Sequence, residues 1–255
     1  MKPFRLTAIL FSATLLLPTF GHAQTAPAEA AESAEAPEII VTVTESANLR
    51  TLADQQGYDG HSSANYLFIV PVKTNVLGKQ GGGPGIDTGK WPDDASLVLL
   101  VKGNVYGGGG NGADGGDTPM VRDGGRGGDA IYVQAPIAIA ITKGGSVKAG
   151  GGGGAGADGI GSGGGGGFPN GKGGNGGSAL QGDGGFIVAG NQGYYGTIGG
   201  GSKGGQRGAP GGDGGNTGQP GQSLSRVGGG EGFAIRTNGN DVVLDNKGDL
   251  RGQAG

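Results

Sequence analysis

Short runs of apolar, β-branched residues recur along the chain, and each run predicts a β-strand. Residues 39–44 (IIVTVT) predict the first of these strands. Residues 66–76 form a longer apolar run that Pro71 interrupts, which predicts one or two edge strands. Residues 48–60 carry apolar side chains at helical spacing before a glycine, so we expect a short helix or helical turn there.

Three later runs share one pattern, in which an apolar stretch is followed by Lys, Gly, a branched residue and a further Gly. They are residues 97–107 (LVLLVKGNVYG), 137–150 (IAIAITKGGSVKAG) and 242–252 (VVLDNKGDLRG). A second, shorter internal repeat relates residues 128–131 (GDAI) to residues 232–235 (GFAI). The recurrence predicts a small repeated β unit that glycine-rich excursions leave and rejoin.

Glycine supplies 67 of the 255 residues, and it loses more backbone entropy on folding than any other residue. Within the excursions Gly-Gly-x triplets recur, as in residues 124–129, 173–178 and 211–216. Three residues per turn is the repeat of the polyproline II helix. Collagen is the nearest alternative, but the chain has only 12 prolines, so we expect a single-chain bundle of polyglycine II helices.

The predicted fold is therefore mainly β and irregular, with a small β repeat collar that carries glycine-rich excursions packed as a polyglycine II helix bundle. The expected parts are a signal peptide (1–23), a disordered Ala/Glu/Pro linker (24–38), a β-rich collar (39–102), a glycine bundle (103–232) with an embedded β unit (130–148), and a carboxy-terminal β unit (233–255).

The amino terminus predicts export. Lys2 and Arg5 precede an apolar stretch, and small residues before and at Ala23 suit cleavage after that residue. The apolar stretch is shorter than the roughly 20 residues that span a bilayer, so no membrane insertion is expected after cleavage. We expect the protein outside the cell, on the outer surface or in the periplasm.

Composition excludes several function classes. A net charge of −3 gives no sign of the excess positive charge that nucleic-acid-binding proteins carry. The chain has no cysteine and only two histidines, His22 and His61, which argues against structural zinc and a histidine base. The adjacent carboxylates of Asp93 and Asp94 could serve in acid–base chemistry, but their sequence context is typical of a solvated turn. We therefore expect neither an enzyme nor a cofactor.

One segment resembles a metal-binding motif. Residues 153–161 (GGAGADGIG) match the nonapeptide that binds Ca²⁺ in parallel β-rolls, which makes Asp158 a weak calcium candidate. Such sites need tandem copies, which this chain lacks, so no metal is expected.

The few aromatic residues are the better candidates for ligand binding. Phe168 and Asn170, and the pair Tyr194 and Tyr195, interrupt the long glycine excursion, where turns far from the collar are expected. Rigid aromatic side chains suit recognition loops, although the same residues could cap helix ends. Trp91 is expected in the core of the β unit.

The order of the non-glycine landmarks resembles the glycine-rich domain of phage tail-fibre and tail-tip host-recognition proteins over residues 48–230. The landmarks are residues 48–50 (NLR), 57–60 (GYDG), 88–92 (TGKWP), 103–116, 128–131 and 137–141 with the following glycines. The resemblance implies a β collar carrying layered polyglycine II helices. It also implies that loops at the far end of the bundle contact a cell-surface receptor.

We therefore expect an exported adhesin-like module that binds a cell-surface glycan or an envelope protein and is held by an anchoring surface protein. A structural envelope or matrix protein is the first alternative. An ice-binding protein is the second, although charged residues such as Lys172 and Asp213 argue against a regular small-residue face.

Overall fold

The computed structural model describes residues 38–61, 65–116, 123–158, 161–176, 178–180, 187–189, 201, 204–205 and 209–255. The predictions for the signal peptide, most of the linker, Tyr194 and Tyr195 lie outside the described residues. Strands dominate the described residues, which contain one short helix, α1 (Leu49–Gln55), so the prediction of a mainly β fold is confirmed. Within the described part of the chain, no helix has the length and apolar character needed to cross a membrane.

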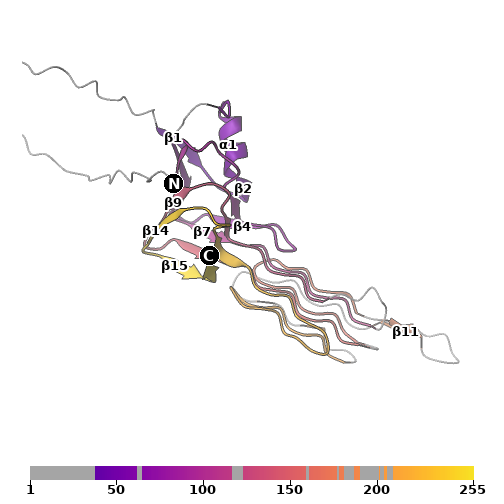
Figure 1. The fold of residues 1–255 in the computed structure, drawn as a ribbon. Coiled ribbons are helices and arrows are strands. Elements are labelled where there is room, and N and C mark those ends of the chain that lie inside the picture. The colour runs from indigo at the N-terminus through magenta and orange to yellow at the C-terminus, as the bar shows by residue number, and fades with distance from the viewer. Residues whose placement is uncertain are drawn as a thin grey trace, which may run out of the picture. The chain divides into compact units, whose positions relative to one another are not determined.

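Fourteen of the strands form three parallel sheets (Figure 1). The first sheet contains β1 (Glu38–Thr42), β3 (Asn65–Val70), β6 (Ser96–Val101), β9 (Ile137–Ile141) and β14 (Val242–Asn246). The second contains β4 (Asn75–Leu77), β7 (Asn104–Tyr106), β10 (Ser146–Lys148) and β15 (Asp249–Arg251). The third contains β2 (Ala47–Asn48), β5 (Ile86–Asp87), β8 (Ile131–Tyr132), β13 (Phe233–Arg236) and β16 (Gln253–Ala254).

From β3 onward the chain visits the first, second and third sheets in that order on every turn, which makes a parallel β-solenoid. Segments with the same sequence pattern occupy equivalent places in successive turns. For example, Leu99 pairs with Ile139, and Ile139 pairs in turn with Leu244. The remaining two strands, β11 (Ser178–Leu180) and β12 (Ile187–Ala189), form a separate antiparallel pair.

The core of the solenoid consists of columns of apolar side chains, one from each turn. Alternate residues of every strand point inward because side chains alternate across a sheet. One column contains Phe68, Leu99 and Ile139, and another contains Val76, Val105 and Val147; all six are buried. Trp91 is partly buried against this core, close to where we expected it.

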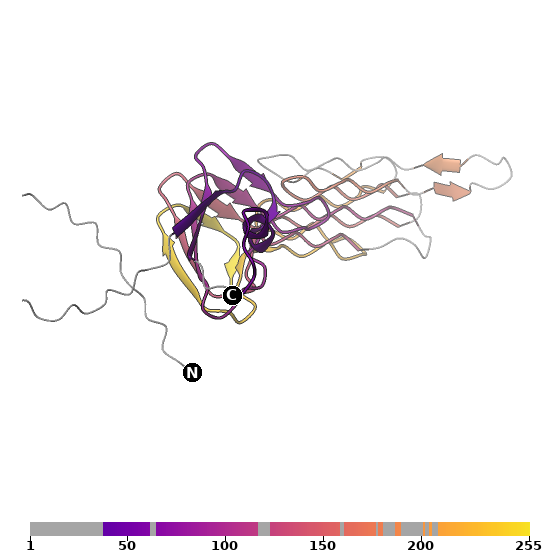
Figure 2. The ribbon, with the colours of Figure 1, turned by 90° about the horizontal axis from the view of Figure 1, so that it is seen from above.

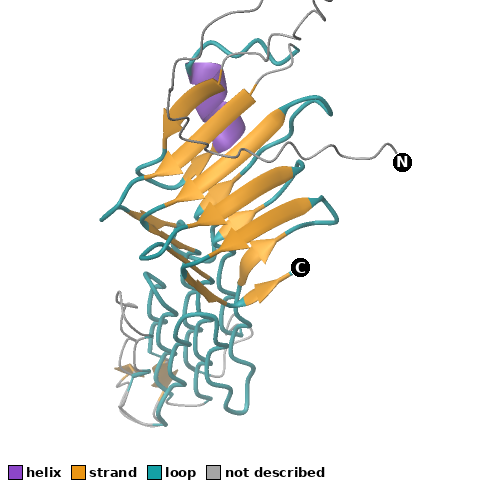
Figure 3. Cartoon of the chain, turned by 90° about the vertical axis from the view of Figure 1, so that its left-hand side faces the viewer, coloured by secondary structure: helices purple, strands orange, loops and turns teal. Residues whose placement is uncertain are grey.

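Helix α1 closes the amino-terminal end of the solenoid (Figure 3). Its Leu49 and Ala53 side chains are fully buried in the core. The helix begins after Asn48, whose side-chain oxygen accepts a 3.0 Å hydrogen bond from the Thr51 amide. The helix therefore lies within residues 48–60, where the pattern predicted it.

The prediction of edge strands over residues 66–76 is only half right. The run is divided into two strands, and β4 does lie at an edge of its sheet. Strand β3, however, lies between β1 and β6, so it is an interior strand. Pro71 does not prevent this, because it falls in the turn after β3 and removes no donor from the sheet.

Every glycine-rich segment leaves the solenoid between the second and third sheets (Figures 1 and 2). Residues 78–85 make a short loop there, whereas residues 107–129 and 149–232 make the long excursions, which we call the glycine bundle. Its extended segments run alternately away from and back toward the solenoid.

Backbone hydrogen bonds in the glycine bundle recur every three residues. Every third residue of the segment 107–116 donates its backbone N–H group to the parallel segment 148–157. The bonds join Gly107 to Lys148, Gly110 to Gly151, Ala113 to Gly154 and Gly116 to Ala157, at 2.8–3.0 Å. The intervening amides of Gly112 and Gly115 donate instead to the carbonyls of Lys172 and Asn175, again three residues apart.

Residues 150–157 lie at the centre of the bundle. Their amides donate to three neighbouring segments, which are residues 123–129, 161–168 and 219–222. Their carbonyls accept from three others, which are residues 107–116, 209–216 and 227–232. Such close neighbours leave no room for side chains: a Cβ added to Gly154 would overlap the carbonyl oxygen of Gly212.

Candidate functional site

The end of the glycine bundle remote from the solenoid is the first candidate site. The outgoing segment 219–222 runs parallel to residues 152–155 and leads to a loop at residues 223–227 (SLSRV). The chain then returns through residues 228–232 to β13. We call residues 223–227 the tip loop; it lies beside Asp158, where the central segment ends.

Hydrogen bonds from several segments fix the tip loop. Within it the Leu224 amide donates to the Arg226 carbonyl at 2.8 Å. The Gly228 amide donates to the Ser223 hydroxyl at 3.0 Å, and the Val227 amide donates to the Asp123 carboxylate at 3.1 Å. The loop is therefore tied both to itself and to the start of the neighbouring return segment.

Asp158 holds the other side of the tip loop. Its carboxylate accepts from the Arg226 guanidinium at 2.6 Å and from the Ser225 hydroxyl at 2.5 Å. The Ser225 and Arg226 hydrogen bonds lower the pKa of Asp158 below its ordinary value of 3.8. This contact is thus fully present above pH 3.8 and is lost as the pH falls through the lowered pKa.

Two aliphatic side chains of the tip loop face solvent. Leu224 is 40% exposed and Val227 is 60% exposed, whereas most apolar side chains among the described residues are buried, chiefly in the solenoid. A fixed loop with exposed apolar side chains beside an ion pair can bind another surface at a reduced conformational-entropy cost.

The weak calcium prediction for Asp158 remains untested, but the structure shows what its carboxylate does. Both of its oxygens are engaged by Ser225 and Arg226. Among the described residues, no three His, Cys, Asp or Glu side chains gather as they would around a metal ion.

The expectation that Phe168 and Asn170 lie in a turn far from the collar is wrong. The chain reverses at residues 168–170 next to the solenoid, where Phe168 is only 2% exposed. Its ring makes an edge-on contact with Tyr106 of β7 at a centroid distance of 5.4 Å. Asn170 accepts from the Gly109 amide and donates to the Gly78 carbonyl, both at 2.9 Å, so it bridges two segments.

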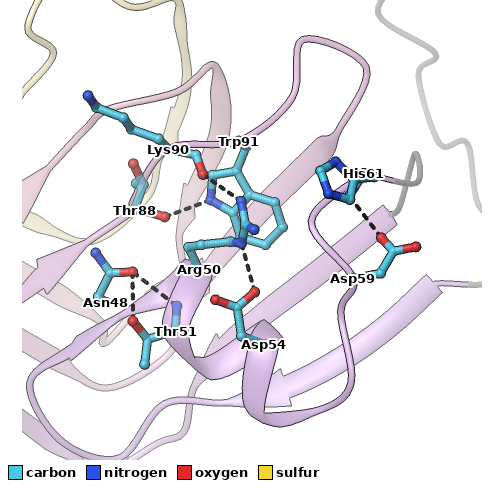
Figure 4. A network of polar contacts seen from close by, with 9 residues as sticks. All are labelled: Asn48, Arg50, Thr51, Asp54, Asp59, His61, Thr88, Lys90 and Trp91. Atoms are coloured by element: carbon cyan, nitrogen blue, oxygen red, sulfur yellow. Dashed lines mark hydrogen bonds and ion pairs between the residues drawn. The ribbon is translucent and has the colours of Figure 1, made fainter.

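Three of the segments that carry the sequence resemblance, residues 48–50, 57–60 and 88–92, lie close together at the amino-terminal end of the solenoid (Figure 4). The Arg50 guanidinium lies over the Tyr58 ring at 4.8 Å and over the Trp91 ring at 5.7 Å. It also donates to Asp54 at 2.8 Å and to the Lys90 carbonyl at 3.0 Å. Burial raises the pKa of the Tyr58 hydroxyl. With its donors used this way, Arg50 serves to join α1 to the solenoid.

Sequence reasoning did not single out the tip loop. A usable signal was present, because residues 223–227 form an apolar and basic interruption between two glycine tracts. The missing information was which interruptions lie far from the solenoid, since the Gly-Gly-x period is the same in outgoing and returning segments.

Comparisons with known proteins agree with this architecture. Residues 37–255 match the family model of the phage tail fibre adhesin Gp38. Among solved structures, a chain of the gp37–gp38 adhesin tip complex of the bacteriophage S16 long tail fibre has the same fold, with a TM-score of 0.58 and 22% sequence identity. The match covers 85% of this chain and 82% of that chain. No curated protein sequence matches this chain.

Proposed function

The chain belongs to the phage tail fibre adhesin Gp38 family, and we propose that it is a non-enzymatic adhesin whose tip loop contacts a receptor on a cell surface. The observation that carries this proposal is the exposure of Leu224 and Val227 in a loop that is held by two other segments, at Asp123 and Asp158, and by a hydrogen bond between its own ends. Exposed apolar side chains on a rigid frame are typical of protein-binding sites.

The glycine bundle is, in this proposal, a stack of polyglycine II helices that carries the tip loop. Its support is the three-residue rhythm of hydrogen bonds, which matches the three residues per turn of that helix. At the outer segments, hydrogen bonds to side chains repeat at the same three-residue spacing. The Asn111 and Asp114 side chains, three residues apart, accept from the amides of Lys172 and Asn175 at 3.0 and 2.6 Å.

The solenoid is proposed to hold the adhesin on its carrier. The S16 structure is a complex of gp38 with gp37 of the long tail fibre, which supports a fibre or other anchoring surface protein as the carrier here. The receptor is proposed to be an envelope protein or a surface glycan. Export through residues 1–23 would place the protein outside the cell, on the outer surface or in the periplasm. Tyr194 and Tyr195 remain proposed receptor contacts.

A pair of serine substitutions tests the tip loop. We expect Leu224→Ser with Val227→Ser to weaken binding to receptor-bearing cells by roughly 30-fold, because two interface side chains that each contribute about 1 kcal/mol together contribute about 2 kcal/mol. The measurement is titration of labelled protein on cells that bind the wild type, monitored by flow cytometry.

Val72→Ser is the matched control, because Val72 is 66% exposed in the turn between β3 and β4, on the solenoid. It should bind like the wild type. Equal binding by the wild type and both variants would rule out the tip loop as the contact surface. Protease or glycosidase treatment of the cells then separates an envelope protein from a glycan as the receptor.

A further inference from the structure

The two ends of the solenoid differ in how they finish the core. At the amino-terminal end, α1 covers the first turn (Figure 3), and its Leu49 and Ala53 side chains are buried in the core. At the other end, β14 occupies the last place of the first sheet. Its Leu244 continues the column of Leu99 and Ile139, yet Leu244 is 39% exposed whereas Ile139 is 1% exposed.

The last turn thus leaves an apolar layer open. Repeat proteins normally need a polar outer face on their terminal repeat, and open strand edges are normally blocked. No described element pairs with the free edge of β14. The β14 end of the solenoid therefore resembles a protein–protein interface more than a solvent-exposed surface.

The free edge of β14 also presents backbone hydrogen-bonding groups. The Ile137 amide donates to the Asp241 carbonyl at 3.1 Å, and the Lys247 amide donates to the Ile141 carbonyl at 2.8 Å. In a parallel ladder alternate residues bond to the same neighbour, so the odd-numbered residues of β14 bond to β9. The N–H and C=O groups of Val242, Leu244 and Asn246 consequently point to the open edge.

We propose that β14 pairs antiparallel with β14 of a second copy of this chain, about a two-fold axis at Leu244. In this register Leu244 faces Leu244, and Val242 faces Asn246, so every outward backbone group of the strand gains a partner. The Leu244 side chains of the two copies then pack against each other and cover the open end of each solenoid core. Isologous two-fold contacts of this kind are the commonest in homo-oligomers.

Charge supports a second copy in this register. Asp241 on one copy lies opposite Lys247 on the other, and the symmetry repeats the pair. Lys247 now contacts Asp245 at 2.9 Å, and both side chains are largely exposed, so this lysine can change partners.

Sedimentation velocity on the full chain tests the proposal at about 50 µM, since a dimer depends on protomer concentration. The wild type should sediment as a dimer, and Leu244→Asp as a monomer. The matched control Val72→Asp, at an exposed site on the solenoid away from β14, should remain a dimer. A monomeric wild type overturns the proposal.

A charge swap tests the register without touching the core. Lys247→Asp alone should weaken the dimer by roughly tenfold, because two opposite-charge pairs become like-charge pairs. The double variant Asp241→Lys with Lys247→Asp restores the pairing and should recover the wild-type dimer. A double variant no more dimeric than Lys247→Asp overturns the proposed register, even if Leu244→Asp fails to fold.

Discussion

Gly154→Ala should lower the free energy of unfolding by about 3 kcal/mol, because the added methyl group overlaps the backbone of a neighbouring segment. The group that it meets is the Gly212 carbonyl, which is main chain and cannot rotate away. Gly154 also donates to Gly165 at 2.8 Å and accepts from Ala113 at 3.0 Å. Relief of the overlap would therefore break hydrogen bonds on at least one side.

Gly230→Ala is the matched control for this substitution. Gly230 belongs to the same bundle, but a Cβ added there meets nothing within 4 Å. Its substitution should change the unfolding free energy by no more than about 0.5 kcal/mol, as is usual for open surface positions. Chemical denaturation of both variants measures the difference, and equal stabilities would contradict close packing of the bundle.

Phe168→Ala is expected to have the second large effect, a loss of about 3–5 kcal/mol in unfolding free energy, which is typical of a buried phenylalanine. The ring lies between the solenoid and the bundle and contacts Tyr106, so its removal leaves a cavity at the junction. Thermal or denaturant unfolding measures this loss. The exposed Leu224→Ala serves as the control and should cost no more than about 0.5 kcal/mol.

The same variant separates a structural role from a recognition role. Below its unfolding temperature, Phe168→Ala should bind receptor-bearing cells as the wild type does, because the ring is buried beside the solenoid. A variant with unchanged stability and lost binding would instead restore the interpretation of Phe168 as a receptor contact.

The β-strands were the most predictable part of the fold, since their side chains follow the two-residue period of a half-buried sheet. In β9 the residues 137, 139 and 141 are buried and the two between them are not, which is the pattern that the sequence displays. The alignment of residues 97–107 with residues 137–150 likewise anticipated the pairing of β6 with β9 and of β7 with β10.

Chain reversals in the glycine bundle were not predictable in the same way. A Gly-Gly-x tract forms the same three-residue pattern in either direction, so sequence alone does not show which end of the bundle a turn occupies. Phe168 was therefore placed at the wrong end. The contacts that fix it, with Tyr106 and through Asn170 with Gly78 and Gly109, are long-range and have no local signature.

The Asn and Asp residues at the third position of the triplets have a structural role at the border of the glycine bundle. Asp213 and Asn216, three residues apart, accept from the Gly204 and Gly201 amides at 3.0 and 2.6 Å. A short carboxylate or carboxamide side chain can thus take the place of a missing backbone carbonyl at the border of the bundle. This gives a physical reason for Asn and Asp at the third position of these triplets.

Amide hydrogen exchange along residues 150–155 is the most direct test of the central claim, that main-chain hydrogen bonds fold the glycine tracts into a rigid frame. The Gly152, Gly153 and Gly154 amides each donate to a different neighbouring segment at 2.8–3.0 Å. We predict that their exchange is slower than in an unfolded chain by a factor on the order of a thousand or more. Exchange at the rate of an unstructured glycine peptide would contradict the account.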